Sequence, residues 1–345
     1  MGEGRGRVVS ILGLVVSVAL TLLGLVLVTF VIGRVMPVDP VLAAVGDRAP
    51  ADVIARVRSE MGLDLPLYRQ FLIYLGAVLR GDLGQSVLTA NPVLSDIARV
   101  FPATIELATT AIVIGIALGV PMGVAAAYYR DRFADHAVRL IGLFGYSVPV
   151  FWLGLVGLLV FYARLGLTGG PGRIDIYLEG LVAPVTGFIL IDSLLAGQGE
   201  VFLSALRHLV LPASILGLFS LAYISRMTRA FMIEQLGQDY VTAARAKGLR
   251  ESQVVWRHAF ANVMVPLVTV VALSYGSLLE GAVLTETVFA WPGLGRYITH
   301  SLLSADMNAV LGGTLVVGVV FLGLNLATDL LYPLLDPRAR PGART

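Results

Sequence analysis

Long uncharged apolar runs alternate with polar segments along the whole chain. A bilayer core about 30 Å thick is crossed by about 20 apolar residues in a helix. About six runs meet this length, so the pattern predicts an all-α integral membrane protein with about six spans. They are Val8–Ile32, Leu107–Tyr129, Leu140–Ala163, Leu209–Ser225, Val263–Thr285 and Ala309–Leu331. The first is too long for a signal-peptide core and no small-residue cleavage site follows it, so we expect a permanent span.

A further apolar stretch, Leu181–Ala196, is short and is interrupted by Pro184, Gly187 and Asp192. We expect it to be interfacial or re-entrant and not a seventh span. Arginine placement supports this reading, because with six spans the arginine-rich flanks and both termini all face the cytoplasm. These arginines are Arg5, Arg7, Arg130, Arg132, Arg139, the cluster Arg226–Arg257, Arg338, Arg340 and Arg344.

The spans leave three long connections. Residues 33–101 and 164–208 are expected outside the cell membrane, and residues 226–262 in the cytoplasm. Within the first, Ala51–Met61 and Leu67–Leu79 have the pattern of short helices, and a Gly-Asp-Leu-Gly turn follows the second.

Composition and missing motifs narrow the function. Charged residues make up 14% of the chain, against about a quarter in soluble proteins, and the net charge of +2 suggests no nucleic-acid partner. Cysteine is absent, which excludes disulfides and thiolate metal sites. The sequence also lacks a P-loop, an H-E-x-x-H zinc motif and a G-x-S-x-G nucleophile elbow. We therefore expect a transport protein without a catalytic residue, cofactor or metal of its own.

Acidic residues near the spans bear on the mechanism of transport. Glu106, Glu280, Glu286 and Asp329 each lie near a predicted span boundary. We expect them to be interfacial carboxylates that snorkel or cap helices, which weakens the case for a proton relay. A proton-coupled secondary transporter or a channel subunit remains the alternative function.

The cytoplasmic connection contains a compact helical signal. Asp239 is a candidate N-cap, Tyr240–Lys247 a two-turn helix, and Gly248 a left-handed C-terminal residue. Arg245 and Lys247 oppose the negative end of the helix dipole. Periodicity alone supports equally a solvated connecting loop and a docking element.

Small residues are compatible with a docking element but do not decide between the two readings. Ala243 and Ala244 are expected to form a smooth face that another surface can approach closely. A second short helix is expected over Glu251–His258.

This connection resembles the EAA loop of ABC importer permeases. Thr242-Ala243-Ala244 followed by Gly248 resembles the general motif, although Thr242 stands where that motif has glutamate and its later Leu-Pro is missing, with Pro266 further on. Four more segments are similar to the dipeptide/oligopeptide branch: Gly62–Pro66, Arg80–Ser86, Glu286–Gly295 and Asp336–Arg338. The branch also has a glycine where Val38 stands after the first span.

The resemblance implies a type I ABC importer permease fold. The whole chain, 1–345, would be one transmembrane permease domain with an extracytoplasmic loop subdomain at 33–101 and a cytoplasmic coupling loop at 226–262. The ATPase-coupling helix would use Asp239, Tyr240, Ala243, Ala244, Arg245, Lys247 and Gly248, and the extracytoplasmic turn Gly81, Asp82, Gly84 and Ser86.

The resemblance also implies partners. A second related permease would complete the pathway, two cytoplasmic ATPases would drive it, and an extracytoplasmic binding protein would deliver the substrate. The complex would lie in the bacterial plasma membrane. Dipeptides or oligopeptides are the expected substrates, with nickel chelates and small glycans as the branch's other options.

Overall fold

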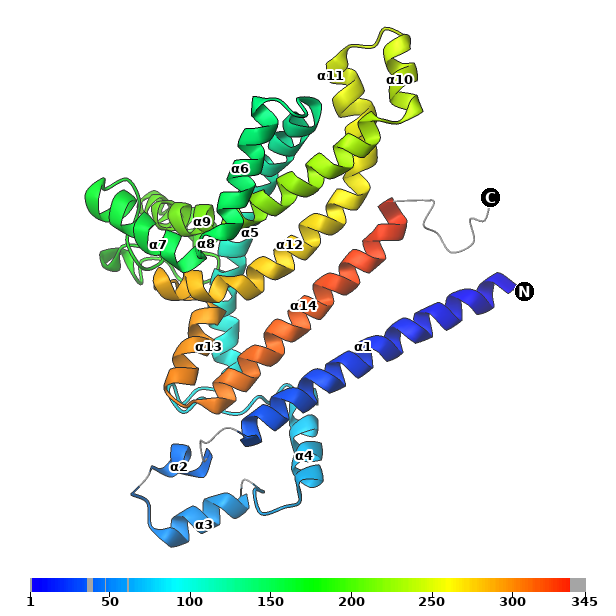
Figure 1. Cartoon of the computed structure of the whole chain (residues 1–345). Coiled ribbons are helices and arrows are strands. Elements are labelled where there is room, and N and C mark those ends of the chain that lie inside the picture. Colours follow the sequence, from blue (N-terminus) through cyan, green and yellow to red (C-terminus); the bar gives the residue numbers. More distant parts are fainter. Residues whose placement is uncertain (1, 36–39, 47, 61, 336–345) are drawn as a thin grey trace. The chain divides into compact units, whose positions relative to one another are not determined.

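The computed structural model describes residues 2–35, 40–46, 48–60 and 62–335 (Figure 1). Apart from one isolated bridge between Gln85 and Pro92, the regular structure of this part of the chain is helical. The elements are α1 Gly2–Val35, α2 Pro40–Val45, α3 Ala51–Glu60, α4 Leu67–Leu79, α5 Val93–Tyr128, α6 Phe133–Ser147, α7 Val150–Gly157, η1 Leu158–Arg164, η2 Ile176–Leu178, α8 Ile189–Leu195, α9 Gly199–Leu236, α10 Asp239–Ala246, α11 Glu251–Gln253, η3 Val254–Ala259, α12 Phe260–Val288, α13 Leu294–Leu303 and α14 Met307–Leu335.

Within the described residues, five helices are long and apolar enough to cross a membrane, and a bent pair makes six if it counts as one span. The five are Val16–Arg34, Val93–Tyr128, Gly199–Leu236, Glu251–Val288 and Met307–Thr328, and the bent pair is Phe133–Ser147 with Val150–Arg164. Five of the predicted apolar runs therefore fall in single long helices, and the sixth falls in the bent pair.

The predicted third span, Leu140–Ala163, is wrong as a continuous helix. The chain bends by 98° between α6 and the segment from Val150 to Arg164. Val148 is extended (φ −91°, ψ 128°), as the residue before a proline prefers, and Pro149 has no N–H to continue the helical ladder. The prediction rests on hydropathy, which shows that a segment is apolar but not whether its helix is continuous.

Other predicted ends also differ from the structure. α5 begins at Val93 and not near Leu107, and α9 is 38 residues long, about 57 Å at 1.5 Å per residue. An apolar run gives only the apolar part of a helix, whereas these helices continue beyond it with polar residues. Prolines inside α5 and α9 are accommodated, as is common in packed membrane helices.

The chain forms two compact units, Met1–Phe101 with Arg296–Gly323 and Pro102–Gly295 with Leu324–Thr345. In the first unit, α4 spans Leu67–Leu79, as predicted, and packs on α1. The Phe30 ring lies 5.4 Å from that of Phe71 and 5.8 Å from that of Tyr74. α3 begins at Ala51 as expected, while Met61, the predicted last residue, lies outside the described residues.

The core of the second unit is built by α9 against α5, α6 and α12 (Figure 1). Gly115, Gly119 and Gly123 of α5 lie one turn apart on the face toward α9. A Cβ at Gly123 would lie 2.6 Å from the Ser225 carbonyl oxygen. Small residues at this spacing let membrane helices approach closely, which explains the tight α5–α9 contact.

The interrupted stretch Leu181–Ala196 contains only the short helix α8 and is not among the candidate spans of the described chain. Asp192 organises the preceding loop, because its buried carboxylate accepts bonds from the N–H groups of Val185, Thr186 and Gly187 and from the Thr186 hydroxyl, at 2.7–3.2 Å. Burial raises the pKa of the Asp192 carboxyl, but these donors outweigh it and hold that pKa below its usual value.

Candidate functional site

The predicted coupling helix is α10, Asp239–Ala246. Gln238, with extended backbone (φ −81°, ψ 152°), occupies the N-cap position, and no side chain caps the helix there. The prediction that Asp239 is the N-cap is therefore wrong by one residue. Asp239 lies instead in the first turn, where its negative charge favours the positive end of the helix dipole.

The C-terminal end of α10 is closed by Gly248. Its φ of +76° is left-handed, as predicted. The Gly248 N–H donates to the Arg245 carbonyl at 2.9 Å and the Leu249 N–H to the Ala244 carbonyl at 3.3 Å. These two bonds form a Schellman motif, which ends the helix sharply.

The two alanines of the motif point to different environments. Val241 and Ala244 are buried in the same core cluster as Val254 and Val255 of η3, whereas Ala243 is exposed. The expectation of one smooth exposed Ala243–Ala244 face is thus wrong. Residues 241 and 244 share a helix face at i, i+3, and that face packs on the segment that follows.

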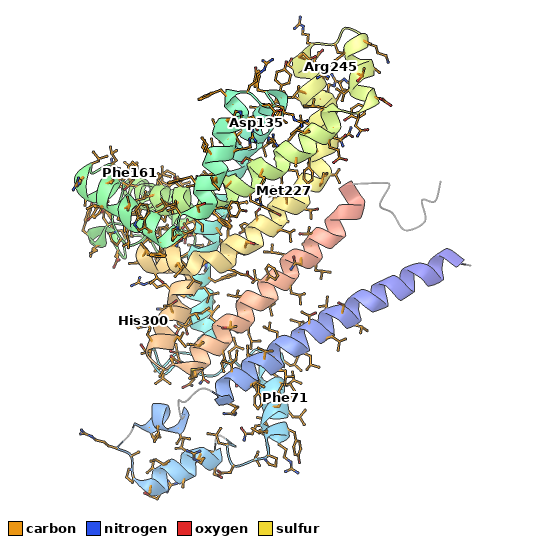
Figure 2. The ribbon with its side chains drawn as sticks, in the orientation of Figure 1. Phe71, Asp135, Phe161, Met227, Arg245 and His300 are labelled. Atoms are coloured by element: carbon orange, nitrogen blue, oxygen red, sulfur yellow. The ribbon has the colours of Figure 1, made fainter. Side chains whose placement is uncertain are left out.

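The outer surface of α10 carries the remaining predicted residues. Tyr240 and Lys247 are exposed, and the Tyr240 hydroxyl donates to Gln235 Oε1 at 2.9 Å. Arg245, labelled in Figure 2, pairs with Glu251 through Nε–Oε1 at 2.9 Å and Nη2–Oε2 at 3.3 Å. This pair ties the end of α10 to the start of α11.

The segment after α10 does not form a separate short helix. α11 continues through the π-helical turn η3, Val254–Ala259, directly into α12, so the predicted end at His258 is wrong. Helical winding is continuous from Glu251 to Val288, so only residues 247–250 separate α10 from a membrane span.

The predicted extracytoplasmic turn is built on two left-handed glycines, Gly81 (φ +78°) and Gly84 (φ +81°). The Gly84 N–H donates to Asp82 Oδ1 at 3.0 Å. Ser86 is buried and its hydroxyl donates to Asp306 Oδ2 at 2.5 Å. Asp306 was not singled out from the sequence, because its partner lies 220 residues away.

The segment Glu286–Gly295 folds against α5. The Trp291 indole N–H donates to the Ala103 carbonyl at 2.9 Å. Thr104 bridges the segment, because its hydroxyl donates to Glu286 Oε1 at 2.6 Å and accepts from the Leu294 N–H at 2.7 Å. The expectation that Glu286 is an interfacial carboxylate is wrong, since its side chain is fully buried.

Glu106 is also buried and paired, contrary to expectation. Arg173 donates to Glu106 Oε2 through Nε at 3.0 Å and Nη2 at 2.5 Å, and the Leu190 N–H donates to Oε1 at 3.1 Å. The Arg173 guanidinium also donates to the Gly187 carbonyl at 2.9 Å. These contacts fasten the 164–198 connection to α5. Glu280 is exposed on α12, and the side chain of Asp329 lies outside the described residues.

Two family models match the chain. Residues 119–341 match "Binding-protein-dependent transport system inner membrane component", and residues 9–108 match the N-terminal model of such membrane components. The resemblance seen in the motifs is thereby confirmed.

Curated relatives align over nearly the whole chain. A probable D,D-dipeptide transport system permease of Escherichia coli strain K12 is 44% identical, over 96% of this chain and 96% of the relative. A di/tripeptide permease of Pseudomonas aeruginosa strain UCBPP-PA14 is 43% identical, over 93% and 95%. A dipeptide permease of Escherichia coli strain K12 is 42% identical, over 95% and 97%.

A solved structure supports the predicted fold. The MetNI methionine ABC transporter, in an inward-facing conformation, matches with a TM-score of 0.50 over 68% of this chain and 93% of the transporter chain, at 16% identity. The family and sequence matches overturn the alternative of a proton-coupled carrier or channel. They imply a complex with an ATPase and a binding protein. The chain belongs to the family of binding-protein-dependent transport system inner membrane components and is a multi-pass permease subunit of an ATP-driven importer.

Proposed function

We propose that this permease imports peptides, with dipeptides or short oligopeptides as its substrates. Similarity carries the proposal: the three relatives described above are 42–44% identical over at least 93% of this chain, and each is named for dipeptide or di/tripeptide transport. Nickel chelates and small glycans are the competing substrate classes.

The proposed complex contains this chain, a second related permease, two cytoplasmic ATPases and an extracytoplasmic binding protein. In the bacterial plasma membrane, both termini of this chain face the cytoplasm, as its arginine-rich flanks favour. Residues 33–101 form an extracytoplasmic subdomain, whose turn at Gly81, Asp82, Gly84 and Ser86 is fixed by the Ser86–Asp306 bond.

The α10 helix is the element proposed to dock on an ATPase. Three features suit it to transmit force: the Gly248 closure, the buried packing of Val241 and Ala244, and the Arg245–Glu251 pair. Tyr240, Ala243 and Lys247 supply the exposed docking face. Because α11 and η3 continue into α12, movement of the ATPases would rock a membrane span directly.

Reconstitution of the complete complex tests the substrate class. Proteoliposomes containing both permeases and both ATPases, supplied with ATP and the binding protein, should accumulate a labelled dipeptide. A labelled nickel chelate and a labelled small glycan are tested in parallel as alternative substrates. Import of either one, with no import of di- or oligopeptides, would overturn the proposed substrate.

A further inference from the structure

The second unit carries three arginines beside a cavity on its membrane-spanning helices. α6, α9 and α12 pack side by side, with Asp135 and Met227 marking α6 and α9 in Figure 2. A cavity of about 410 Å³ opens between α6 and α9, and Arg139, Arg226 and Arg229 contribute to its lining. Three guanidinium groups beside a membrane span require anionic partners or water.

Only part of this positive charge is neutralised within the unit. Arg229 forms a two-point pair with the buried carboxylate of Asp135, Nε–Oδ1 at 2.6 Å and Nη2–Oδ2 at 2.8 Å. Arg139 lies 3.4 Å from the same carboxylate. Across the described ranges, no carboxylate is paired with Arg226. The cavity therefore keeps a net positive charge, centred on Arg226.

Two tyrosine rings hold the Arg226 guanidinium in place. Its Cζ lies 5.1 Å from the ring centroid of Tyr146 and 5.6 Å from that of Tyr223. Such cation–π contacts orient a guanidinium without consuming its N–H donors. Arg226 is thus positioned to donate hydrogen bonds to an incoming anion.

A second cavity adjoins the first at Tyr146. It has a volume of about 160 Å³ and shares Tyr146 with the first cavity. Its lining combines the serines Ser220, Ser274 and Ser277 with Phe219, Tyr223 and Leu273. The Ser220 and Ser274 hydroxyls donate to the Gly217 and Val270 carbonyls. The cavity therefore combines one exposed serine, Ser277, with an aromatic and aliphatic wall, which suits a small organic anion with apolar side chains.

We propose that Arg226, oriented by Tyr146 and Tyr223, binds the carboxylate of the transported peptide where the peptide leaves the pathway toward the cytoplasm, at the face formed by α6, α9 and α12. This inference rests on the proposed import of peptides. A guanidinium matches a carboxylate in shape and charge and can donate two parallel hydrogen bonds to it. Arg226 is then a specificity-determining residue for substrates with a free C-terminal carboxylate.

Cysteine protection tests the site directly, because the chain has no natural cysteine. Ser277→Cys is introduced into this chain, and the complex of both permeases and both ATPases is reconstituted in proteoliposomes. The binding protein is left out because its own selectivity would mask that of the permease. A hydrophilic thiosulfonate reagent should modify residue 277, as followed on this chain by mass spectrometry. A dipeptide with a free carboxylate should slow this reaction. The C-terminal amide of the same dipeptide should give equal protection only at an about tenfold higher concentration, because it loses a charge-assisted hydrogen bond.

Substitution of the arginine supplies the decisive comparison. In Arg226→Gln the dipeptide and its amide should protect residue 277 alike, and in Arg226→Lys part of the difference should persist. The matched control is Arg132→Gln, an exposed arginine that lines neither cavity, and it should behave as the unchanged protein.

Three results would overturn the inference. One is equal protection by the dipeptide and the amide in the presence of Arg226. Another is a preference that survives in Arg226→Gln. The third is reaction of residue 277 with a membrane-soluble maleimide but not with the hydrophilic reagent, which would make this face a lipid contact. Dipeptide import by the same proteoliposomes, after addition of the binding protein, shows separately whether the proposed function holds.

Discussion

Thr104 and Glu286, 182 residues apart in the chain, are joined by a 2.6 Å hydrogen bond from the threonine hydroxyl to the buried carboxylate. The same hydroxyl accepts the Leu294 N–H at 2.7 Å, so one side chain of α5 bonds both ends of the Glu286–Gly295 turn. A Cβ on Gly293 would collide with the Glu286 carboxylate, which explains why glycine stands there.

Replacement of Thr104 by valine should destabilise the permease. The near-isosteric change removes a partner from a buried carboxylate and from a buried N–H, at a cost of about 1–3 kcal/mol. Thermal unfolding of the purified protein in lipid nanodiscs measures it. The control is Thr109→Val on the same helix, where the hydroxyl bonds Tyr275 at an exposed position and the loss should be smaller. Equal stability of Thr104→Val and the unchanged protein would contradict this role.

The two alanines of the coupling loop should respond differently to the same enlargement. Ala243→Leu adds its side chain on the exposed face, so the fold should keep its stability while ATP-driven import falls. Ala244→Leu crowds the contact with η3 and should lower stability by about 1–3 kcal/mol. Thermal unfolding and peptide uptake, measured on both variants, separate the effects. Normal uptake by Ala243→Leu would remove Ala243 from the docking face.

Topology can be read by labelling in the natural cysteine-free background. Ser59→Cys in α3 is exposed and should react with an impermeant thiol reagent from outside the cell membrane. Ser252→Cys, exposed in α11, should react after the membrane is opened. Ser86 is unsuitable because it is buried against Asp306. Labelling of both positions from one side would refute the proposed orientation.

Local patterns predicted those parts of the fold that local forces determine. The bounds of Leu67–Leu79 follow from an amphipathic period that begins directly after Pro66. The left-handed conformation of Gly248 is predicted because a glycine directly after a helix commonly ends it in this way. The bend at Val148–Pro149 is also a local effect, because it follows from the proline. The length of an apolar run does not reveal it.

Partners distant in sequence could not be predicted in this way. Glu106 and Glu286 each lie near the end of an apolar run, as an interfacial residue would. Each is instead bonded to a partner distant in sequence, 67 residues away for Glu106 and 182 for Glu286. The inward position of Ala244 likewise depends on η3, whose direct continuation into α12 no cap signal announces. The sequence marks Arg226 only as a topological charge, because one of its two tyrosine neighbours, Tyr146, lies on a different helix.

Acylation of Lys247 tests most directly whether α10 couples this permease to ATP hydrolysis. It is the one lysine of the sequence and is exposed at the end of the proposed docking face. An amine-reactive reagent is applied from the cytoplasmic side, and modification of Lys247 is followed by mass spectrometry. Lys247 should react readily in membranes that hold the permeases alone, and should be protected when the ATPases are bound. The Ala243→Leu variant should lose this protection together with peptide import. Equal acylation of Lys247 with and without the ATPases, together with normal import by Ala243→Leu, would contradict the assignment of α10 as the coupling helix.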